Sequence, residues 1–120
     1  MLVVIGSDGD TLESKVAKRF GHANYFVRYD TNTKSLESFK NLTEGHNHEN
    51  LQEFLDMGVE AFIVGNIGPH AFQIINTPKS YVFLARKMSL SEAIEKLQQN
   101  SLEHLTEPTV KHSINQRHEH

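Results

Sequence analysis

The sequence predicts an α/β domain in which helices cover both faces of a central, largely parallel sheet. Short apolar runs rich in β-branched and aromatic residues alternate along the chain with stretches at helical spacing. The runs 2–5, 61–64 and 80–85 are apolar almost without interruption, which is typical of strands buried on both faces. The length of 120 residues suits one domain. We therefore expect the element order βαββαβαβα, with one antiparallel hairpin early in the chain.

The first predicted unit is a strand at Leu2–Ile5, a polar turn at residues 6–10, and a helix that ends near residue 18. Leu12 and Val16 have helical spacing behind Asp10 or Thr11, either of which suits an N-cap. The turn has neither the lysine of a P-loop nor the glycine spacing of a dinucleotide fingerprint. We therefore interpret it as a tight connection and not as a phosphate loop.

The second unit is the expected hairpin. Its strands are Tyr25–Asp30 and Ser35–Phe39, and the polar residues between them suit a tight turn. A polar loop then leads to a helix over Glu49–Met57, with apolar residues at i, i+3 and i+4. Gly58 follows that helix, where a left-handed C′ residue is usual.

The most informative stretch runs from Ala61 to Phe72. Ala61–Val64 reads as a buried strand, Gly65 and Gly68 shape the turn after it, and Pro69 suits the first position of a helix. The free N–H groups of such a helix start predict an anion site, with His70 in the same turn.

The remaining elements are a strand over Ser80–Ala85 and a last helix that begins at Ser89 or Ser91. We expect one domain over residues 1–105. Residues 106–120 lose the apolar periodicity, and we expect them to form a flexible tail that contains histidines.

Composition narrows the choice of partners. A net charge of -3 gives no overall attraction to nucleic acid or to acidic membranes, so we expect neither as a partner. The absence of cysteine excludes disulfides, thiolate nucleophiles and cysteine-ligated metal sites. The apolar start of the chain is too short for a signal peptide or a membrane span, so we expect a cytoplasmic protein.

Histidine is the residue type that suggests metal chemistry, since the chain has eight of them. His46 and His48 offer two imidazoles from one loop, and His22 and His70 could join them if the loops meet at one end of the sheet. The simpler interpretation of His46 and His48 is a polar loop with solvated side chains. The acidic residues near the first turn could hold magnesium, but they are more often found complementing a helix dipole.

Several motifs together carry a resemblance to a known family. Gly6-Ser7-Asp8-Gly9 is followed by Arg19-Phe20-Gly21-His22-Ala23, and later by the run from Gly58 to Ala71 that contains Gly65-Asn66-Ile67-Gly68-Pro69-His70. In order and spacing, residues 2–102 resemble the dinitrogenase iron–molybdenum cofactor biosynthesis and binding family, of the NifX/NafY type. The resemblance implies a three-layer α/β/α domain with a ribonuclease H-like motif and a five-stranded mixed sheet.

The same resemblance implies a function linked to nitrogen fixation. Family members that act in nitrogenase assembly carry the iron–molybdenum cofactor, or its iron–sulfur precursor, between assembly proteins and the enzyme. The chain would then be a non-enzymatic carrier of a metal cluster or small anionic cofactor. Its cofactor-binding residues would be Arg19, Gly21, Gly65, Asn66, Gly68 and His70, and its metal ligands His22, His46 and His48.

One position departs from the family pattern. Many members have a histidine directly before Phe-Gly, where a cluster ligand is expected, and this chain has Arg19. Arginine does not deprotonate to coordinate a metal, but it can pair with an anionic cluster or a carboxylate.

Two alternatives stay open. The chain could be a regulatory or interaction module that binds an ordinary small metabolite. A ribonuclease H-like nuclease is the weaker alternative, because two-metal chemistry needs carboxylates on the strands, and the runs 2–5 and 61–64 contain none.

Overall fold

The structure is a computed structural model that describes residues 1–41 and 49–110. Within these ranges the chain forms six strands, three α-helices and one 3-10 turn. None of these helices is long and apolar enough to cross a membrane. In chain order the elements are β1 (Leu2–Ser7), η1 (Phe20–His22), β2 (Tyr25–Asp30), β3 (Leu36–Lys40), α1 (Glu49–Asp56), β4 (Ala61–Val64), α2 (Pro69–Ile75), β5 (Tyr81–Leu84), α3 (Leu90–Gln98) and β6 (Glu103–Leu105).

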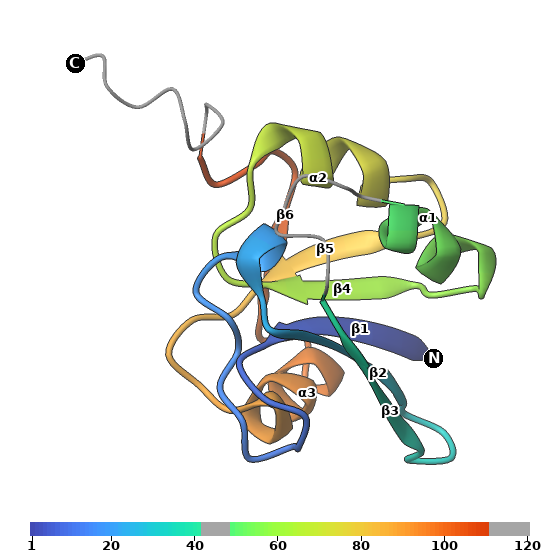
Figure 1. The fold of residues 1–120 in the computed structure, drawn as a ribbon, viewed down its shortest axis with the longest axis vertical. Helices are drawn as coiled ribbons and strands as arrows, with labels where there is room; N and C mark the ends of the chain where they lie inside the picture. Colours follow the sequence, from blue (N-terminus) through green and yellow to red (C-terminus); the bar gives the residue numbers. More distant parts are fainter. Residues whose placement is uncertain (42–48, 111–120) are drawn as a thin grey trace.

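The sheet is mixed and has the strand order β3-β2-β1-β4-β5-β6 (Figure 1). The central strands β1, β4 and β5 are parallel to one another. The hairpin of β2 and β3 adds antiparallel pairings on one side of them, and β6 adds one on the other side. The carboxyl ends of the three parallel strands therefore meet at one edge of the sheet.

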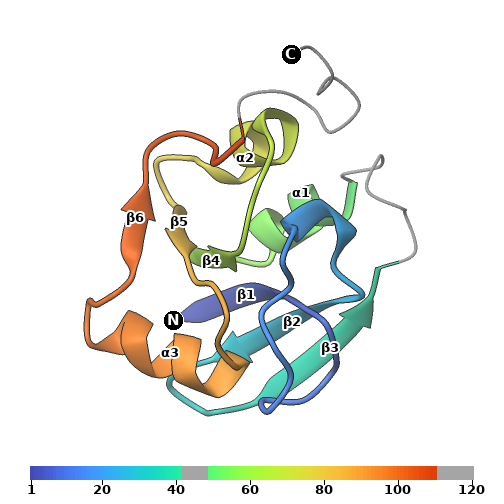
Figure 2. The ribbon, with the colours of Figure 1, turned by 90° about the vertical axis from the view of Figure 1, so that its left-hand side faces the viewer.

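Helices cover both faces of this sheet. α1 and α2 lie over one face and α3 over the other (Figure 2). Alternation along β1 supplies both cores, because Val4 packs in the cluster with α1 and α2 while Val3 and Ile5 pack in the cluster with α3. β1 and β4 are thus buried on both faces, as their apolar runs predicted. The same prediction is wrong for β5, where Tyr81 is exposed and only Val82 is fully buried.

The predicted fold class is confirmed, with corrections to the element count. The domain has the expected α/β/α layers, but the sheet has six strands where five were expected. Four strands run in one direction, yet only two of the five pairings are parallel, because β2 and β6 run the opposite way. β6 was missed because it is three residues long and buries only Leu105.

The predicted helix around Leu12 and Val16 is wrong. This segment makes turns and isolated strand bridges instead, pairing Val16 with Ser7 and Lys15 with Ser89. Val16 and Ala17 pack into opposite core clusters, which adjacent residues do in an extended chain. The segment also has a structural task, because the carbonyls of Leu12 and Ser14 accept hydrogen bonds from the first N–H groups of α3.

The end of the described chain lies closer to the fold than the sequence predicted. Residues 106–110 return from β6 to the loop between β4 and α2, where Thr109 and Val110 bond to Ile67. The remainder of the predicted tail, with His112, His118 and His120, lies outside the described residues.

Candidate functional site

Three loops meet where the parallel strands end. They are residues 8–19 after β1, 65–68 after β4, and 85–89 after β5. Backbone hydrogen bonds join them, among them Val16 N to Met88 O at 2.9 Å and Asn66 N to Lys18 O at 2.7 Å. After β1 the chain continues to β2, toward one lateral edge of the sheet, and after β4 it continues to β5, toward the other lateral edge. Ligands of open α/β sheets bind at such a switch point.

Asn66 is the centre of this junction. Its backbone accepts a hydrogen bond from Phe20 N at 2.8 Å and donates one to Lys18 O, so Arg19 and Asn66 form a short parallel bridge. The predicted cofactor residues Arg19 and Asn66 are therefore direct neighbours, although they are 47 positions apart in the sequence.

Gly65 makes this junction sterically possible. A Cβ atom at this position would lie 2.7 Å from the carbonyl oxygen of Lys18 and still closer to that of Ala17. Gly21 is different, since a Cβ atom there would meet nothing within 4 Å. Gly65 is thus required for the close approach of two backbones, whereas Gly21 has no comparable constraint.

Arg86 also belongs to this junction, although the sequence did not point to it as a candidate. Its Nη2 donates a hydrogen bond of 2.7 Å to Asn66 Oδ1, which places Arg86 on the opposite side of Asn66 from Arg19. The signal was present, because Arg86 follows β5 just as Asn66 follows β4, and parallel strands end at the same edge.

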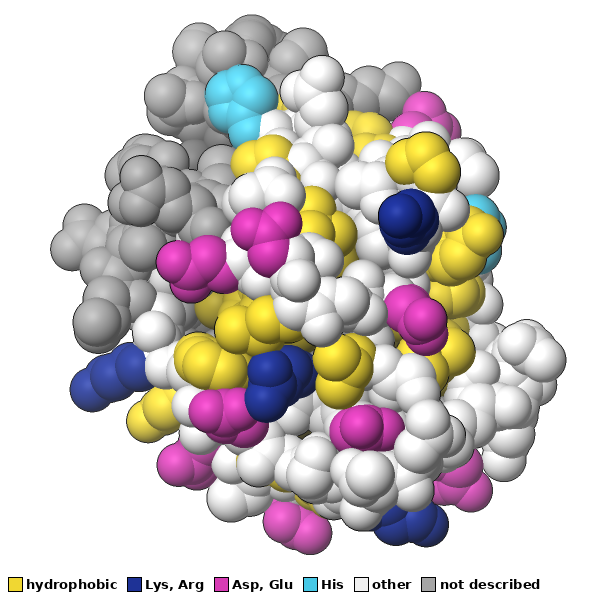
Figure 3. Space-filling view, turned by 90° about the vertical axis from the view of Figure 1, so that its right-hand side faces the viewer, with side chains coloured by type: hydrophobic (Ala, Val, Ile, Leu, Met, Phe, Trp, Pro, Cys, Tyr) yellow, Lys and Arg dark blue, Asp and Glu magenta, His cyan; other side chains and the backbone are white. Residues whose placement is uncertain are grey.

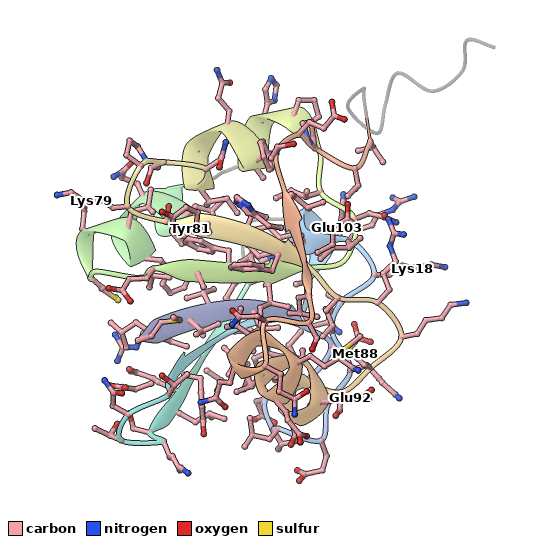
Figure 4. The ribbon with its side chains drawn as sticks, turned by 180° about the vertical axis from the view of Figure 1, so that it is seen from behind. Lys18, Lys79, Tyr81, Met88, Glu92 and Glu103 are labelled. Carbon is pink, nitrogen blue, oxygen red and sulfur yellow. The ribbon has the colours of Figure 1, made fainter. Side chains whose placement is uncertain are left out.

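Four basic side chains lie together at this junction, which we call the basic junction, although the loop after β1 also carries Asp8, Asp10 and Glu13. Lys18 and Arg19 extend from the loop after β1, and Arg86 and Lys87 from the loop after β5; all four side chains are exposed. The ion pairs of the described ranges lie elsewhere, between the Met1 amino group and Asp30 and between Arg28 and Glu37. Within the described part of the chain, the four cations thus have no ion-pair partner. Figure 4 shows Lys18 at this end of the molecule and Lys79 at the other.

The predicted histidine cluster is not assembled within the described residues. His22 ends η1 and His70 lies in the first turn of α2, and both are exposed. Residues 1–41 and 49–110 contain no group of three histidine, aspartate or glutamate side chains that could hold a metal ion. His46 and His48 lie outside the described residues.

Two backbone donors just before α2 are already used within the protein. Gly68 is the N-cap and Pro69 is at the start of the helix, as predicted. The N–H of Asn66 bonds to Lys18 O, and the N–H of Ile67 bonds to Thr109 Oγ1 at 2.8 Å. These two donors, which precede the N-cap, are therefore not available to an anion.

A separate open groove of about 850 Å³ lies at the opposite edge of the sheet. Its lining includes Met1, Glu60, Ala61, Lys79 and Tyr81, at the amino ends of β4 and β5. Figure 3 shows this face, where hydrophobic side chains alternate with single charges of both signs. It shares no residue with the basic junction, and its mixed charges give no preference for an anion.

Comparisons with known proteins agree with the fold. The family model described as dinitrogenase iron-molybdenum cofactor matches residues 1–100. The solved structure of a NifB-like protein from Thermotoga is 30% identical, with a TM-score of 0.77, and the match covers 94% of this chain and 97% of that one. A comparison with curated proteins gives no match.

Two further structures share the fold at lower identity. The apo form of the orange protein from Desulfovibrio gigas is 23% identical with a TM-score of 0.79, over 89% of this chain and 94% of that one. A dinitrogenase-like protein from Methanocaldococcus jannaschii is 23% identical with a TM-score of 0.70, over 90% and 97%. With a family model that covers most of its length, the chain belongs to the dinitrogenase iron-molybdenum cofactor family.

Proposed function

We propose that this chain is a non-enzymatic carrier that binds a metal cluster or a small anionic cofactor at the basic junction. The observation that carries the proposal is the group of four cations, Lys18, Arg19, Arg86 and Lys87, at the switch point of the sheet. The net charge of the chain is -3, yet these four cations form no ion pair within the described residues. They are therefore available to attract an anion.

The chemistry of the four side chains suits a multiply charged anion. The two guanidinium groups offer planar forks of donors, and the two ammonium groups add compact charges. Arg19 and Arg86 stand on either side of Asn66, in loops that continue three neighbouring strands. Arg19 is thus held beside Asn66 through the backbone, and Arg86 through its side chain. An anion larger than a single phosphate could contact both.

The residues fit a cluster that is held by its charge and not by coordination. The sequence has no cysteine, and the described residues contain no set of three metal ligands. Arg19, at the position where many relatives have histidine, cannot coordinate a metal but can donate to the oxygen or sulfide atoms on the outside of a cluster. The predicted metal ligands His22, His46 and His48 stay a prediction for an additional contact.

Such binding suits a carrier. Soft thiolate ligands of a cofactor-assembly protein would bind the metal of the cluster more strongly than hydrogen bonds from arginine would hold its surface. Transfer of the cluster from this chain to that partner would therefore be favourable. A nuclease is the weaker proposal, because β1 and β4 have no carboxylate for a two-metal site.

The test is anaerobic binding of two probes followed by visible absorption: ferrous iron with sulfide, and tetrathiomolybdate. We expect the chain to take up at least one of them. R19Q and R86Q should each weaken binding about five- to tenfold, as expected for loss of an exposed charged hydrogen bond. K79Q removes the same charge at the opposite edge and should leave binding within about twofold.

Two outcomes would contradict this account. Equal losses in R19Q, R86Q and K79Q would indicate general attraction to the surface. Binding of citrate in preference to both metal probes would favour the alternative of a module for an ordinary metabolite.

A further inference from the structure

The described chain ends on the same loop that holds Asn66. After β6, residues 106–110 cross to the connection between β4 and α2 (Figures 1 and 2). Thr109 N and Val110 N both donate to Ile67 O, at 3.1 and 3.3 Å. The first residues of the predicted flexible tail are therefore bonded to a loop of the proposed site.

The hydroxyl of Thr109 is the one side-chain group among these contacts, and it bonds to both the N–H and the carbonyl of Ile67. Thr109 Oγ1 accepts a hydrogen bond of 2.8 Å from Ile67 N and lies 3.3 Å from Ile67 O, to which it donates. A hydroxyl group can act as acceptor and donor at once, whereas a methyl group can do neither. Ile67 is only 2% exposed, so water cannot readily replace the hydroxyl as partner of its N–H.

This contact fixes the orientation of one peptide group. The carbonyl of the Asn66–Ile67 peptide accepts from Phe20 N, and its N–H donates to Thr109. A peptide group is planar, so hydrogen bonds at both ends determine its tilt. The Asn66 side chain, which accepts from Arg86, extends from the residue directly before this N–H.

We propose that Thr109 is a positioning residue for the anion site: its hydroxyl fixes the Asn66–Ile67 peptide and so holds Asn66 where it orients Arg86. This inference rests on the proposed function and adds to it a requirement for a hydroxyl group in the segment after β6. The segment does not contact the anion itself in this account.

The experiment compares the full-length wild-type chain with T109V, T109S and T106V. It measures hydrogen exchange of the Ile67 amide and the affinity for tetrathiomolybdate. T109V keeps the shape of the side chain but removes the hydroxyl, and T109S keeps the hydroxyl. Thr106 lies in the same segment, is exposed and makes no hydrogen bond in the described structure, so T106V is the matched control.

In T109V we expect faster exchange at Ile67 and about tenfold weaker binding, equivalent to the loss of one buried hydrogen bond. T109S should restore both, and T106V should change neither. Rescue by serine separates a role of the hydroxyl from a general effect on packing.

Different results would overturn different parts of the account. If T109V accelerates exchange but binds as the wild type does, the positioning role is wrong and the proposed function stands. If T109S is as weak as T109V, the hydroxyl is not the active group. If the wild-type chain does not bind the probe, the proposed function fails, and the positioning role fails with it.

A measurement on the wild type covers the case in which T109V does not fold. Coupling between two sites is reciprocal, so saturating tetrathiomolybdate should slow hydrogen exchange at the Ile67 amide. The control is the amide of Val59, which precedes the amino end of β4 and bonds to Phe54 O; its exchange should slow less. Equal protection of the two amides would contradict the proposal.

Discussion

Gly65 illustrates how far a single residue of the candidate site could be predicted. The sequence placed it at the turn after a buried strand, but it could not show that the backbone of Ala17 and Lys18 passes over it. That contact joins segments nearly fifty residues apart, and the segment before residue 18 was expected to be helical. Arg86 was missed for a similar reason, since its partner Asn66 belongs to a different loop.

The steric requirement at Gly65 gives a prediction with an internal control. G65A should destabilise the protein by about 2–3 kcal/mol, because the new methyl group would overlap two carbonyl oxygens and force the loops apart. G21A should change stability by no more than about 0.5 kcal/mol, since its surroundings are open. Urea unfolding of both variants measures the difference. Equal stability of the two would mean that the loops do not approach as described.

Among the elements, the segment between β1 and η1 is the clearest difference between expectation and structure. Leu12 and Val16 have the spacing of a helix, but the same spacing is compatible with an irregular chain that contacts the sheet at several points. The deciding interactions are the bonds from Leu90 N to Ser14 O and from Ser91 N to Leu12 O, which bridge more than seventy residues. Local patterns contain no information about such partners. By contrast, α1, the start of α2 and the β2–β3 hairpin were predicted closely, because glycines, Pro69 and turn residues determine them locally.

The start of α3 permits a second prediction. Ser89 is the N-cap, and its Oγ accepts a hydrogen bond of 3.1 Å from Glu92 N. S89A should cost about 1 kcal/mol of unfolding free energy, the usual value of an N-cap. S91A is the control, because Ser91 is exposed and its side chain has no hydrogen bond in the described structure, and it should be nearly neutral. A larger loss in S91A than in S89A would contradict the assignment of the cap.

The β2–β3 hairpin predicts a pH dependence through Asp30. The N–H of Asn32 donates to Asp30 Oδ1 at 2.8 Å, and this bond is the main cause that holds the pKa of Asp30 below its ordinary value of 3.8. A lowered folded pKa means that the contribution to stability is present above the unfolded pKa and is lost as pH falls through the folded pKa. Urea unfolding should therefore show a difference between wild type and D30N at neutral pH that shrinks below pH 3.8. A difference that stays constant at acidic pH would argue against this role of the carboxylate.

At the scale of the whole molecule, the fold produces an electrostatic feature that composition hides. The net charge of -3 predicted no overall attraction to nucleic acid or to acidic membranes. The sheet topology nevertheless brings two pairs of adjacent cations, 18–19 and 86–87, to one edge. Net charge is a sum over the chain, so it contains no information about which loops become neighbours. The fold class could be predicted from sequence, and Arg19 and Asn66 stay predictions as cofactor-binding residues, whereas the four-cation group required the topology.

This charge distribution predicts a dependence on salt. If the anion is held by exposed cations, its dissociation constant should increase steadily as ionic strength is raised from 0.05 M to 0.5 M, as the Debye length falls from above to below about 10 Å. A titration series with tetrathiomolybdate measures this increase. Affinity that does not change with salt would indicate that direct coordination, and not charge, holds the metal.

The central claim is the location of the site, and an NMR titration of the labelled full-length chain with tetrathiomolybdate tests it most directly. We predict that the largest chemical-shift changes occur at the amides of residues 18–20, 65–67 and 85–87, where the three loops meet. Changes confined to residues 58–61 and 79–81, around the groove at the opposite edge, would contradict the claim, as would a spectrum without changes.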